Sequence, residues 1–214
     1  MLKDRCVHIV EADAGAREHG AAVLRSAGYD VQLHRSGQHF LDRTPDDRPG
    51  CVLLDIHMPE PDGLRVQNLL ITRGLAMPVI VFTGDSQVGM AARAMKAGAL
   101  HFLEKPYRDS DLLEMVADAF ARLEAAEADA DRKILAVSRL SKLSPREQQV
   151  VQGMLAGLPN KLIAHSLGIS IRTVEMHRTH LMDKIGVRNL SGVFRLWLDA
   201  EWQTPEPVGL DKQS

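Results

Sequence analysis

The sequence predicts an α/β protein with a doubly wound, five-stranded parallel sheet, followed by a helical linker and a small all-α domain. Two observations lead to this prediction. Between residues 6 and 103, five short apolar runs alternate with segments whose apolar residues recur at helical spacing. From Ser144 onward, helical segments follow one another, separated by breaks that contain Gly. Strands that alternate with helices are typical of a parallel sheet with helices packed on it.

The expected strands are short and mostly apolar, at Cys6–Val10, Asp30–Leu33, Cys51–Leu54, Val79–Phe82 and Leu100–Leu103. Helices are expected between them, at Ala14–Ala27, Gly37–Asp42, Leu64–Arg73 and Gln87–Ala97, and Gly28 and Gly98 follow two of these as C-terminal caps. No Gly or Pro occurs from Asp111 until Pro145, so a long helix should continue into the linker. This linker is either a coiled coil across a dimer or a single solvated helix.

The length and the charge distribution indicate two domains. A chain of 214 residues can bury two modest cores. Residues 1–120 carry 13 Lys and Arg against 17 Asp and Glu, a net charge of −4, whereas residues 143–196 carry 7 against 3, a net charge of +4. We expect a first domain over 1–120, a linker over 121–142, a second domain over 143–203 and a disordered tail over 204–214. The basic second domain favours a polyanion as its partner.

The two cysteines, Cys6 and Cys51, each begin an apolar run, where a thiol usually behaves as a small buried hydrophobe. Their spacing provides neither a disulfide framework nor a zinc site. No apolar run approaches 18 residues, and the first residues turn acidic too soon for a signal peptide. These features favour a soluble, cytoplasmic protein without a membrane partner.

Four of the expected strands are followed or ended by a polar residue: Glu11, Asp55, Thr83 and Lys105. By itself, Asp55 could equally cap a turn. Right-handed crossovers, however, bring the carboxyl ends of parallel strands to one crevice, where ligands bind. Carboxylates suit a hard divalent cation, and a hydroxyl and an ammonium suit phosphate oxygens. The pattern therefore favours a site for Mg²⁺ and a phosphoryl group.

Residues 6–120 resemble the receiver domain of two-component response regulators. The resemblance lies in an acid after the first strand (Glu11), DxxMP at Asp55, Thr83 after the fourth strand and Lys105-Pro106 after the fifth. It implies a flavodoxin-like sheet in which Asp55 accepts a phosphoryl group from a phosphohistidine of a sensor histidine kinase. It also implies that Thr83 and Lys105 bind the phosphoryl oxygens, and that the Lys105-Pro106 bond is cis.

The same resemblance implies a metal site and a switch. Mg²⁺ would be held by Glu11, Asp55 and the backbone carbonyl of His57, whose imidazole is expected to be exposed. Thr83 and Phe102 would move together on phosphorylation and remodel the face made by the fourth helix, the fifth strand and the fifth helix. Phe102 is more simply expected as a core residue, and the two roles are compatible.

One position departs from the family pattern. The family usually has two adjacent acids after the first strand, whereas here Glu11 is followed by Ala12. One carboxylate fewer should weaken Mg²⁺ binding, because the charge count tunes such sites. Asp13 is either a substitute ligand or, as we favour at this position, the N-terminal cap of the following helix.

The second domain begins with a strong helix start signal. Ser144 and Glu147 have the spacing of a capping box, with a proline at the first helical position. After a Gly-Leu-Pro break, Asn160–Leu167 forms a short helix, and a turn containing Gly168 joins it to a helix that starts at Ser170. Two helices joined in this way predict a helix-turn-helix. In the helix that starts at Ser170, the residues expected to face inward are Ile171, Val174, Leu181 and Ile185.

This stretch resembles the LuxR-type DNA-binding domain of the NarL/FixJ response regulators, through LSPRE, GLPNKxIA, LGIS, RTVExH and KIGVRN. The resemblance implies that the helix Ser170–Lys184 enters the major groove. Glu175 either accepts a hydrogen bond from cytosine or pairs with its neighbours. The residues near bases or phosphates would be Thr173, Glu175, Met176, Arg178 and Thr179, and those on the phosphate backbone Lys161, Arg172, Lys184 and Arg188.

A fourth helix is expected at Leu190–Ala200, and in this family such a helix can form the dimer contact. Trp197 and Trp202 are the only tryptophans, and both are expected near it.

The sequence therefore predicts a response regulator and not a conventional enzyme. A sensor histidine kinase would phosphorylate Asp55, and the activated chain would form a homodimer and bind promoter DNA, with RNA polymerase as a further partner. The first alternative is an atypical receiver, in which Ala12 leaves transcription regulated independently of phosphorylation. The second is a phosphate sink or protein-interaction module with a vestigial DNA-binding half, which the intact basic helix and capping box disfavour.

Overall fold

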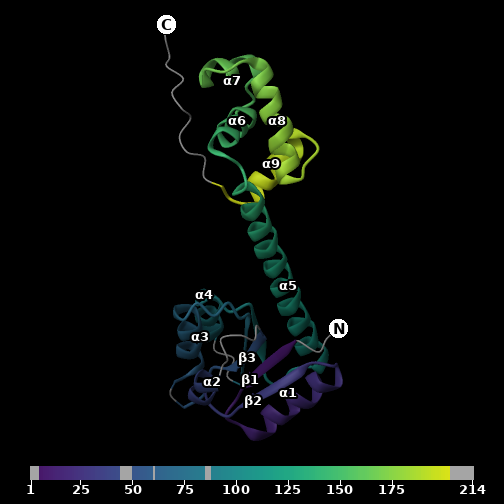
Figure 1. The fold of residues 1–214 in the computed structure, drawn as a ribbon. Coiled ribbons are helices and arrows are strands. Elements are labelled where there is room, and N and C mark those ends of the chain that lie inside the picture. The colour runs from purple at the N-terminus through teal and green to yellow at the C-terminus, as the bar shows by residue number, and fades with distance from the viewer. Residues whose placement is uncertain (1–4, 44–49, 60, 85–87, 203–214) are drawn as a thin grey trace. The chain divides into compact units, whose positions relative to one another are not determined.

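The computed structural model describes residues 5–43, 50–59, 61–84 and 88–202. The expected tail over 204–214 lies outside the described residues. The chain divides into two compact units, within Met1–Ala125 and Ala126–Ser214, and each is described by itself. Figure 1 shows the elements of both units. Among the described residues, no helix combines the length and the apolar character needed to span a membrane.

The first unit is built on a parallel sheet in the order β2-β1-β3-β4-β5. Its strands are β1 (Cys6–Val10), β2 (Asp30–His34), β3 (Gly50–Asp55), β4 (Val79–Thr83) and β5 (His101–Glu104). The order reverses between β1 and β3, which is where open sheets of this kind form their ligand crevice. The predicted fold class is confirmed for this unit.

Helices cover both faces of the sheet: α1 (Ala14–Ser26), α2 (Gly37–Arg43), α3 (Gly63–Thr72), α4 (Val88–Lys96) and the long α5 (Asp109–Leu140). Successive strand residues point to opposite faces. Ile9 therefore packs in one buried cluster with side chains of α1 and α5, and Val10 in another with side chains of α2, α3 and α4. Gly63 is required where α3 begins, because a Cβ there would collide with the backbone oxygen of Asp55.

The core of the first unit also holds titratable groups. His8 on β1 and His34 on β2 are buried, with 3.1 Å between His8 Nδ1 and His34 Nε2. Burial lowers the pKa of each imidazole to about 4. Cys6 and Cys51 are both buried, as expected, and burial raises the pKa of the Cys51 thiol.

Helix α5 runs unbroken into the second unit, so the expected long helix is confirmed. Val116 and Phe120 are buried in the core of the first unit, and Ala136 and Leu140 are buried in the core of the second. Ile134 is 67% exposed. The choice between a coiled coil and a single solvated helix stays a prediction.

The second unit consists of the end of α5 with α6 (Pro145–Leu155), α7 (Asn160–Leu167), α8 (Ile171–Ile185) and α9 (Leu190–Asp199). The predicted capping box is present, because Ser144 and Glu147 exchange hydrogen bonds at the start of α6. Gly168 ends α7 in the left-handed conformation, with φ of 64°, which favours glycine. The turn after it leads directly into α8, as a helix-turn-helix requires.

The prediction for the buried face of α8 is confirmed at three positions and wrong at one. Val174, Leu181 and Ile185 are buried, whereas Ile171 is 45% exposed. Ile171 has the same helical spacing, but it occupies the first position of α8, directly after the N-cap Ser170. The buried face of α8 begins one turn later, at Val174, so helical periodicity alone placed the start of this face too early.

Candidate functional site

The carboxyl ends of β1, β3, β4 and β5 bring Glu11, Asp55, Thr83 and Lys105 together at one edge of the sheet. The ammonium of Lys105 forms an ion pair with Glu11 Oε2, and its Nζ lies 3.2 Å from Asp55 Oδ2. Both carboxylates are buried, with Glu11 1% and Asp55 5% exposed. One cation therefore bridges two buried acids that lie 44 positions apart in the sequence.

Lys105 is positioned by both its backbone and its side chain. Its backbone N–H donates to the carbonyl oxygen of Thr83 at 2.9 Å. Its Nζ lies 4.2 Å from the centre of the Phe82 ring, where a cation is attracted by the face of the aromatic system. The peptide bond between Lys105 and Pro106 is cis, in agreement with the expectation from the receiver resemblance.

The loop after β1 fixes the Glu11 carboxylate and decides the role of Asp13. The backbone N–H of Asp13 donates to Glu11 Oε1 at 2.8 Å, while Arg17 donates to the Glu11 backbone oxygen at 2.7 Å. Burial raises the pKa of Glu11, and the hydrogen bond from Lys105 opposes that effect. The Asp13 side chain accepts from Ala16 N at 2.7 Å, so the favoured prediction of an N-cap for α1 is confirmed.

The loop after β3 carries a contact that the sequence did not reveal. The backbone N–H of His57 donates to Asp55 Oδ1 at 3.1 Å, and His57 Nδ1 lies 3.0 Å from Thr83 Oγ1. His57 is exposed, as expected, but its imidazole also reaches the buried Thr83. No local spacing signals this pair, because the two residues are 26 positions apart. Phe102 is half-buried against the cluster that includes Val81.

The oxygen atoms at this edge fit a magnesium ion, although few of the groups there are carboxylates. Among the residues that the structure describes, no group of three or more His, Cys, Asp and Glu side chains could hold a metal. The two carboxylates of Glu11 and Asp55 remain, together with backbone oxygens. Mg²⁺ is commonly bound by one or two carboxylates, with waters and phosphate oxygens completing its shell, so this set is sufficient in kind. Ala12 adds no ligand atom from its side chain.

In the second unit, the side chains expected to contact DNA lie on α8 and its surroundings. Lys161, Arg172, Glu175, Met176, Thr179, Lys184 and Arg188 are exposed, and Thr173 and Arg178 are half-buried. Two of the cations already have partners: Arg178 donates to Asn160 Oδ1 at 2.8 Å, and Lys184 donates to Glu147 Oε2 at 2.7 Å. These contacts hold both side chains at the surface of the unit.

The Glu147 carboxylate is the buried anchor of the second unit. Burial opposes its ionisation, but hydrogen bonds from Lys184 and Ser144 outweigh that effect and lower the pKa of Glu147 to about 2. Glu147 is therefore ionised at neutral pH. Sequence reasoning identified its capping role but missed Lys184, which lies 37 positions away.

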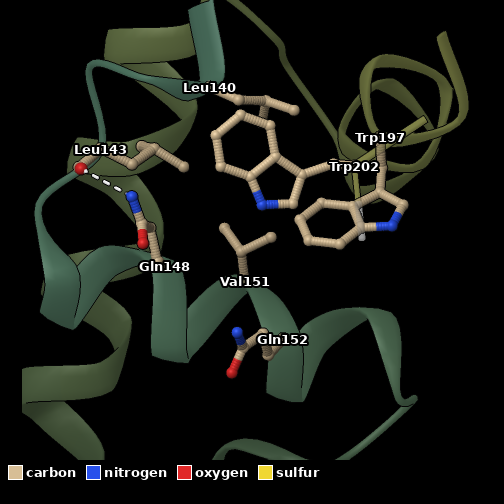
Figure 2. A pocket seen from close by; sticks show the side chains of 7 residues that line it. All are labelled: Leu140, Leu143, Gln148, Val151, Gln152, Trp197 and Trp202. Carbon is tan, nitrogen blue, oxygen red and sulfur yellow. Dashed lines mark hydrogen bonds between the residues drawn. The ribbon is translucent and has the colours of Figure 1, made fainter. Parts of the chain in front are cut away.

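The two tryptophans line a small pocket between the end of α5, α6 and the end of α9. Their ring centres are 6.2 Å apart. Figure 2 shows both indoles with Leu140 and Val151, and Gln148 donating to the Leu143 carbonyl at 3.2 Å. Both tryptophans are partly buried against the core. On α9 itself, the apolar side chains that project into solvent include Phe194 and the 72% exposed Leu198.

Comparison with known proteins identifies both units. Residues 7–117 match the response regulator receiver domain, and residues 141–197 match the luxR family of bacterial regulatory proteins. The chain is 41% identical to the transcriptional regulatory protein FixJ of Rhizobium meliloti (strain 1021), over 92% of this chain and 97% of that protein. It is 39% identical to FixJ of Bradyrhizobium diazoefficiens, over 91% of this chain and 95% of that protein.

Solved structures agree with these relatives. The response regulator StyR is similar with a TM-score of 0.74 and 35% identity, over 90% of this chain and 97% of that chain. Full-length FixJ from B. japonicum is similar with a TM-score of 0.60 and 37% identity, over 93% of this chain and 98% of that chain. The fold, the edge of the sheet and the helix-turn-helix thus agree with the family matches. The chain belongs to the two-component response regulators of the NarL/FixJ family, which join a receiver domain to a LuxR-type DNA-binding domain and regulate transcription.

Proposed function

We propose that a sensor histidine kinase phosphorylates this regulator at Asp55. The observation that carries the proposal is the buried Asp55 carboxylate with the Lys105 ammonium 3.2 Å away. A carboxylate oxygen of Asp55 attacks the phosphorus while its bond to the kinase imidazole nitrogen breaks. The nitrogen keeps the bonding electron pair, and the phosphoryl group passes to Asp55. Lys105 stabilises the negative charge on the phosphoryl oxygens.

Glu11, Asp55 and the backbone carbonyl of His57 would hold Mg²⁺ beside this group. When bound, the ion neutralises phosphoryl charge and orients the donor. Lys105 supports the same site without the ion, because its single positive charge contacts both carboxylates and offsets part of their negative charge. The Asp13 backbone N–H keeps Glu11 oriented although Ala12 replaces the second acid of the family pattern. We therefore propose a weakened Mg²⁺ site that still functions.

The downstream steps follow from the placement of the remaining residues. Thr83 would turn its hydroxyl toward the phosphoryl group and Phe102 would fill the space, which remodels the face of α4, β5 and α5. The activated chain would form a homodimer, for which the exposed Phe194 and Leu198 on α9 offer an apolar contact. RNA polymerase is a further proposed partner at the promoter.

The second unit would then bind promoter DNA through α8 in the major groove. The proposed contact residues on that helix are Arg172, Thr173, Glu175, Met176, Arg178, Thr179 and Lys184, whereas Lys161 lies on α7 and Arg188 follows α8. The exposure of Met176 favours an apolar contact to a thymine methyl group. The cations position the helix on phosphates, so binding should weaken as salt rises.

The intact mass of the chain after incubation with acetyl phosphate and Mg²⁺ tests this proposal. We expect one phosphoryl adduct, labile in base and absent from Asp55→Asn. The same samples are then titrated with a promoter fragment at two salt concentrations, where the adduct should tighten specific binding. No adduct from either acetyl phosphate or a partner kinase would leave the phosphorylation-independent receiver as the better account. Adduct without specific DNA binding would instead favour the phosphate sink.

A further inference from the structure

His57 connects the proposed phospho-acceptor with the proposed switch. Its backbone N–H donates to Asp55 Oδ1 at 3.1 Å, and its imidazole Nδ1 lies 3.0 Å from Thr83 Oγ1. The main chain of His57 thus contacts the Asp55 carboxylate, and its side chain contacts the Thr83 hydroxyl. These are the two groups that the proposed phosphorylation would bring together. The backbone contact is available to any residue at position 57, whereas the contact with the hydroxyl depends on the imidazole.

The backbone of Thr83 is held in place on both sides. Thr83 is the last residue of β4, which pairs with β3 and with β5, and its carbonyl accepts from Lys105 N–H at 2.9 Å. The hydroxyl therefore moves chiefly by rotation of the side chain, between a small number of staggered positions. It carries a single hydrogen, so it can donate to only one acceptor at a time.

We propose that His57 is a positioning residue that holds the Thr83 hydroxyl back from the phosphoryl group. In this arrangement His57 carries its hydrogen on Nε2, and Nδ1 accepts from Thr83. The inference rests on the proposed phosphorylation of Asp55. A charged phosphoryl oxygen is a stronger hydrogen-bond acceptor than a neutral imidazole, so the Thr83 hydroxyl can donate to the phosphoryl group instead of to His57. The imidazole therefore slows the movement of the Thr83 hydroxyl toward the phosphoryl group but does not prevent it.

Three substitutions separate the imidazole contact from the rest of the residue, because each leaves the backbone of position 57 in place. His57→Ala removes the acceptor, and His57→Gln moves it one bond too far out. His57→Asn places an amide oxygen where Nδ1 lies. One neutral hydrogen bond contributes about a fivefold factor. We expect His57→Ala and His57→Gln to gain the acetyl phosphate adduct about fivefold faster than the unchanged chain, with His57→Asn restoring the slower rate.

The Thr83→Ala background isolates the pair. If the imidazole acts through the hydroxyl, His57→Ala has no further effect on adduct formation once Thr83 is alanine. Equal or slower adduct formation in His57→Ala, or the same acceleration in both backgrounds, overturns the inference. If the unchanged chain forms no adduct with acetyl phosphate or with a kinase, the proposed function fails and this inference with it. If the unchanged chain forms the adduct and the His57 variants form it at the same rate, the inference is overturned but the proposed function stands.

A second measurement needs no phosphorylation. The ¹⁵N chemical shifts of the His57 ring in the full chain report which nitrogen carries the hydrogen. We expect Nδ1 to be unprotonated and its shift to change in Thr83→Ala. A hydrogen on Nδ1 overturns the inference, because the ring would then donate to the hydroxyl and leave its hydrogen available to the phosphoryl group.

Discussion

Each unit of this regulator contains a buried glutamate that pairs with a lysine. Burial raises the pKa of both carboxyl groups, but the net shifts have opposite signs. At the edge of the sheet, Glu11 shares Lys105 with Asp55, and burial raises its pKa. In the second unit, Glu147 has Lys184 and the capping hydrogen bonds of Ser144, and its pKa falls to about 2. Burial outweighs the hydrogen bonds that reach Glu11, whereas the hydrogen bonds that reach Glu147 outweigh its burial.

The histidines extend this contrast. His8 and His34 are buried in the first unit, and burial lowers the pKa of both. In the terms of linkage, the first unit contains groups whose buried charge would be costly, whereas the second unit has compensated the charge that it buries. The two units should consequently respond differently to pH and to the loss of a single donor.

The largest expected effect is on the acid stability of the first unit. The unfolded chain binds protons at His8 and His34 near pH 6.5, but the folded unit binds them only near pH 4. The free energy of unfolding should therefore fall as pH drops through this window, by about 1.4 kcal/mol per pH unit for each histidine. Urea titrations at pH 7 and 5, followed by NMR signals from each unit, test this.

The second unit provides the internal control for that titration, because Glu147 stays ionised throughout the window. His165→Gln, at an exposed position of α7, is the matched substitution that should leave both midpoints unchanged. If both units lose stability in parallel between pH 7 and 5, the buried imidazoles are not the cause.

The next effect concerns Lys105. Lys105→Ala should slow the formation of the acetyl phosphate adduct at Asp55 about 100-fold, because it removes a preorganised cation from the developing phosphoryl charge. The exposed Lys96, at the end of α4, is the control: Lys96→Ala removes the same charge from the same unit without touching this site. A time course of intact mass measures both. Equal rates in the two variants would mean that charge in general, and not the Lys105 bridge, matters.

Neutralising the two glutamates should change stability with opposite signs. The pKa of Glu147 lies below its unfolded value of 4.5, so its charge stabilises above pH 4.5 and this contribution is lost as pH falls toward 2. Glu147→Gln should cost about 2 kcal/mol at pH 7, after allowing for solvent screening at the exposed end of Lys184. The pKa of Glu11 is raised, so its charge destabilises as pH rises above 4.5, and Glu11→Gln should stabilise at pH 7.

Urea denaturation measures both variants. Tryptophan fluorescence follows the second unit, since Trp197 and Trp202 both lie there. NMR signals of the sheet follow the first. Destabilisation by both substitutions would show that Glu11 is compensated as fully as Glu147, and the contrast between the units would then be lost.

The smallest expected effect is on the two helix caps beside these acids. Asp13→Ala removes one hydrogen bond to the start of α1 and should cost about 1 kcal/mol. Ser144→Ala should cost more, about 2 kcal/mol, because the Ser144 hydroxyl also lies 2.9 Å from Glu147 Oε2. Thermal unfolding of each variant compares them, and equal costs would mean that the hydroxyl contributes only its cap.

Sequence reasoning predicted the elements of this fold well because its signals are local. Apolar runs, helical spacing and caps such as Asp13 and Ser144 act within a few residues. The same reasoning placed the four polar strand ends at one edge, since the parallel topology does so for any sequence. It was wrong at Ile171, which has the helical spacing of the buried residues of α8 but is 45% exposed at the first position of the helix.

The side-chain pairs around the buried Glu11, Thr83 and Glu147 could not be predicted from the sequence. His57 with Thr83, Lys184 with Glu147 and Lys105 with Glu11 are separated by 26, 37 and 94 positions. Which donor a buried carboxylate or hydroxyl receives depends on the rotamers of two distant side chains, and no spacing rule carries that information. The expected roles of the residues proposed to contact DNA stay predictions.

The placement of the two thiols has a consequence for measuring the motions of this molecule. Cys6 and Cys51 lie in adjacent strands at the centre of the sheet, and the folded chain shields both. A thiol reagent can modify them only when the sheet opens. The labelling rate of the native chain therefore counts openings of the receiver domain, without an introduced probe and without a signal from the DNA-binding half.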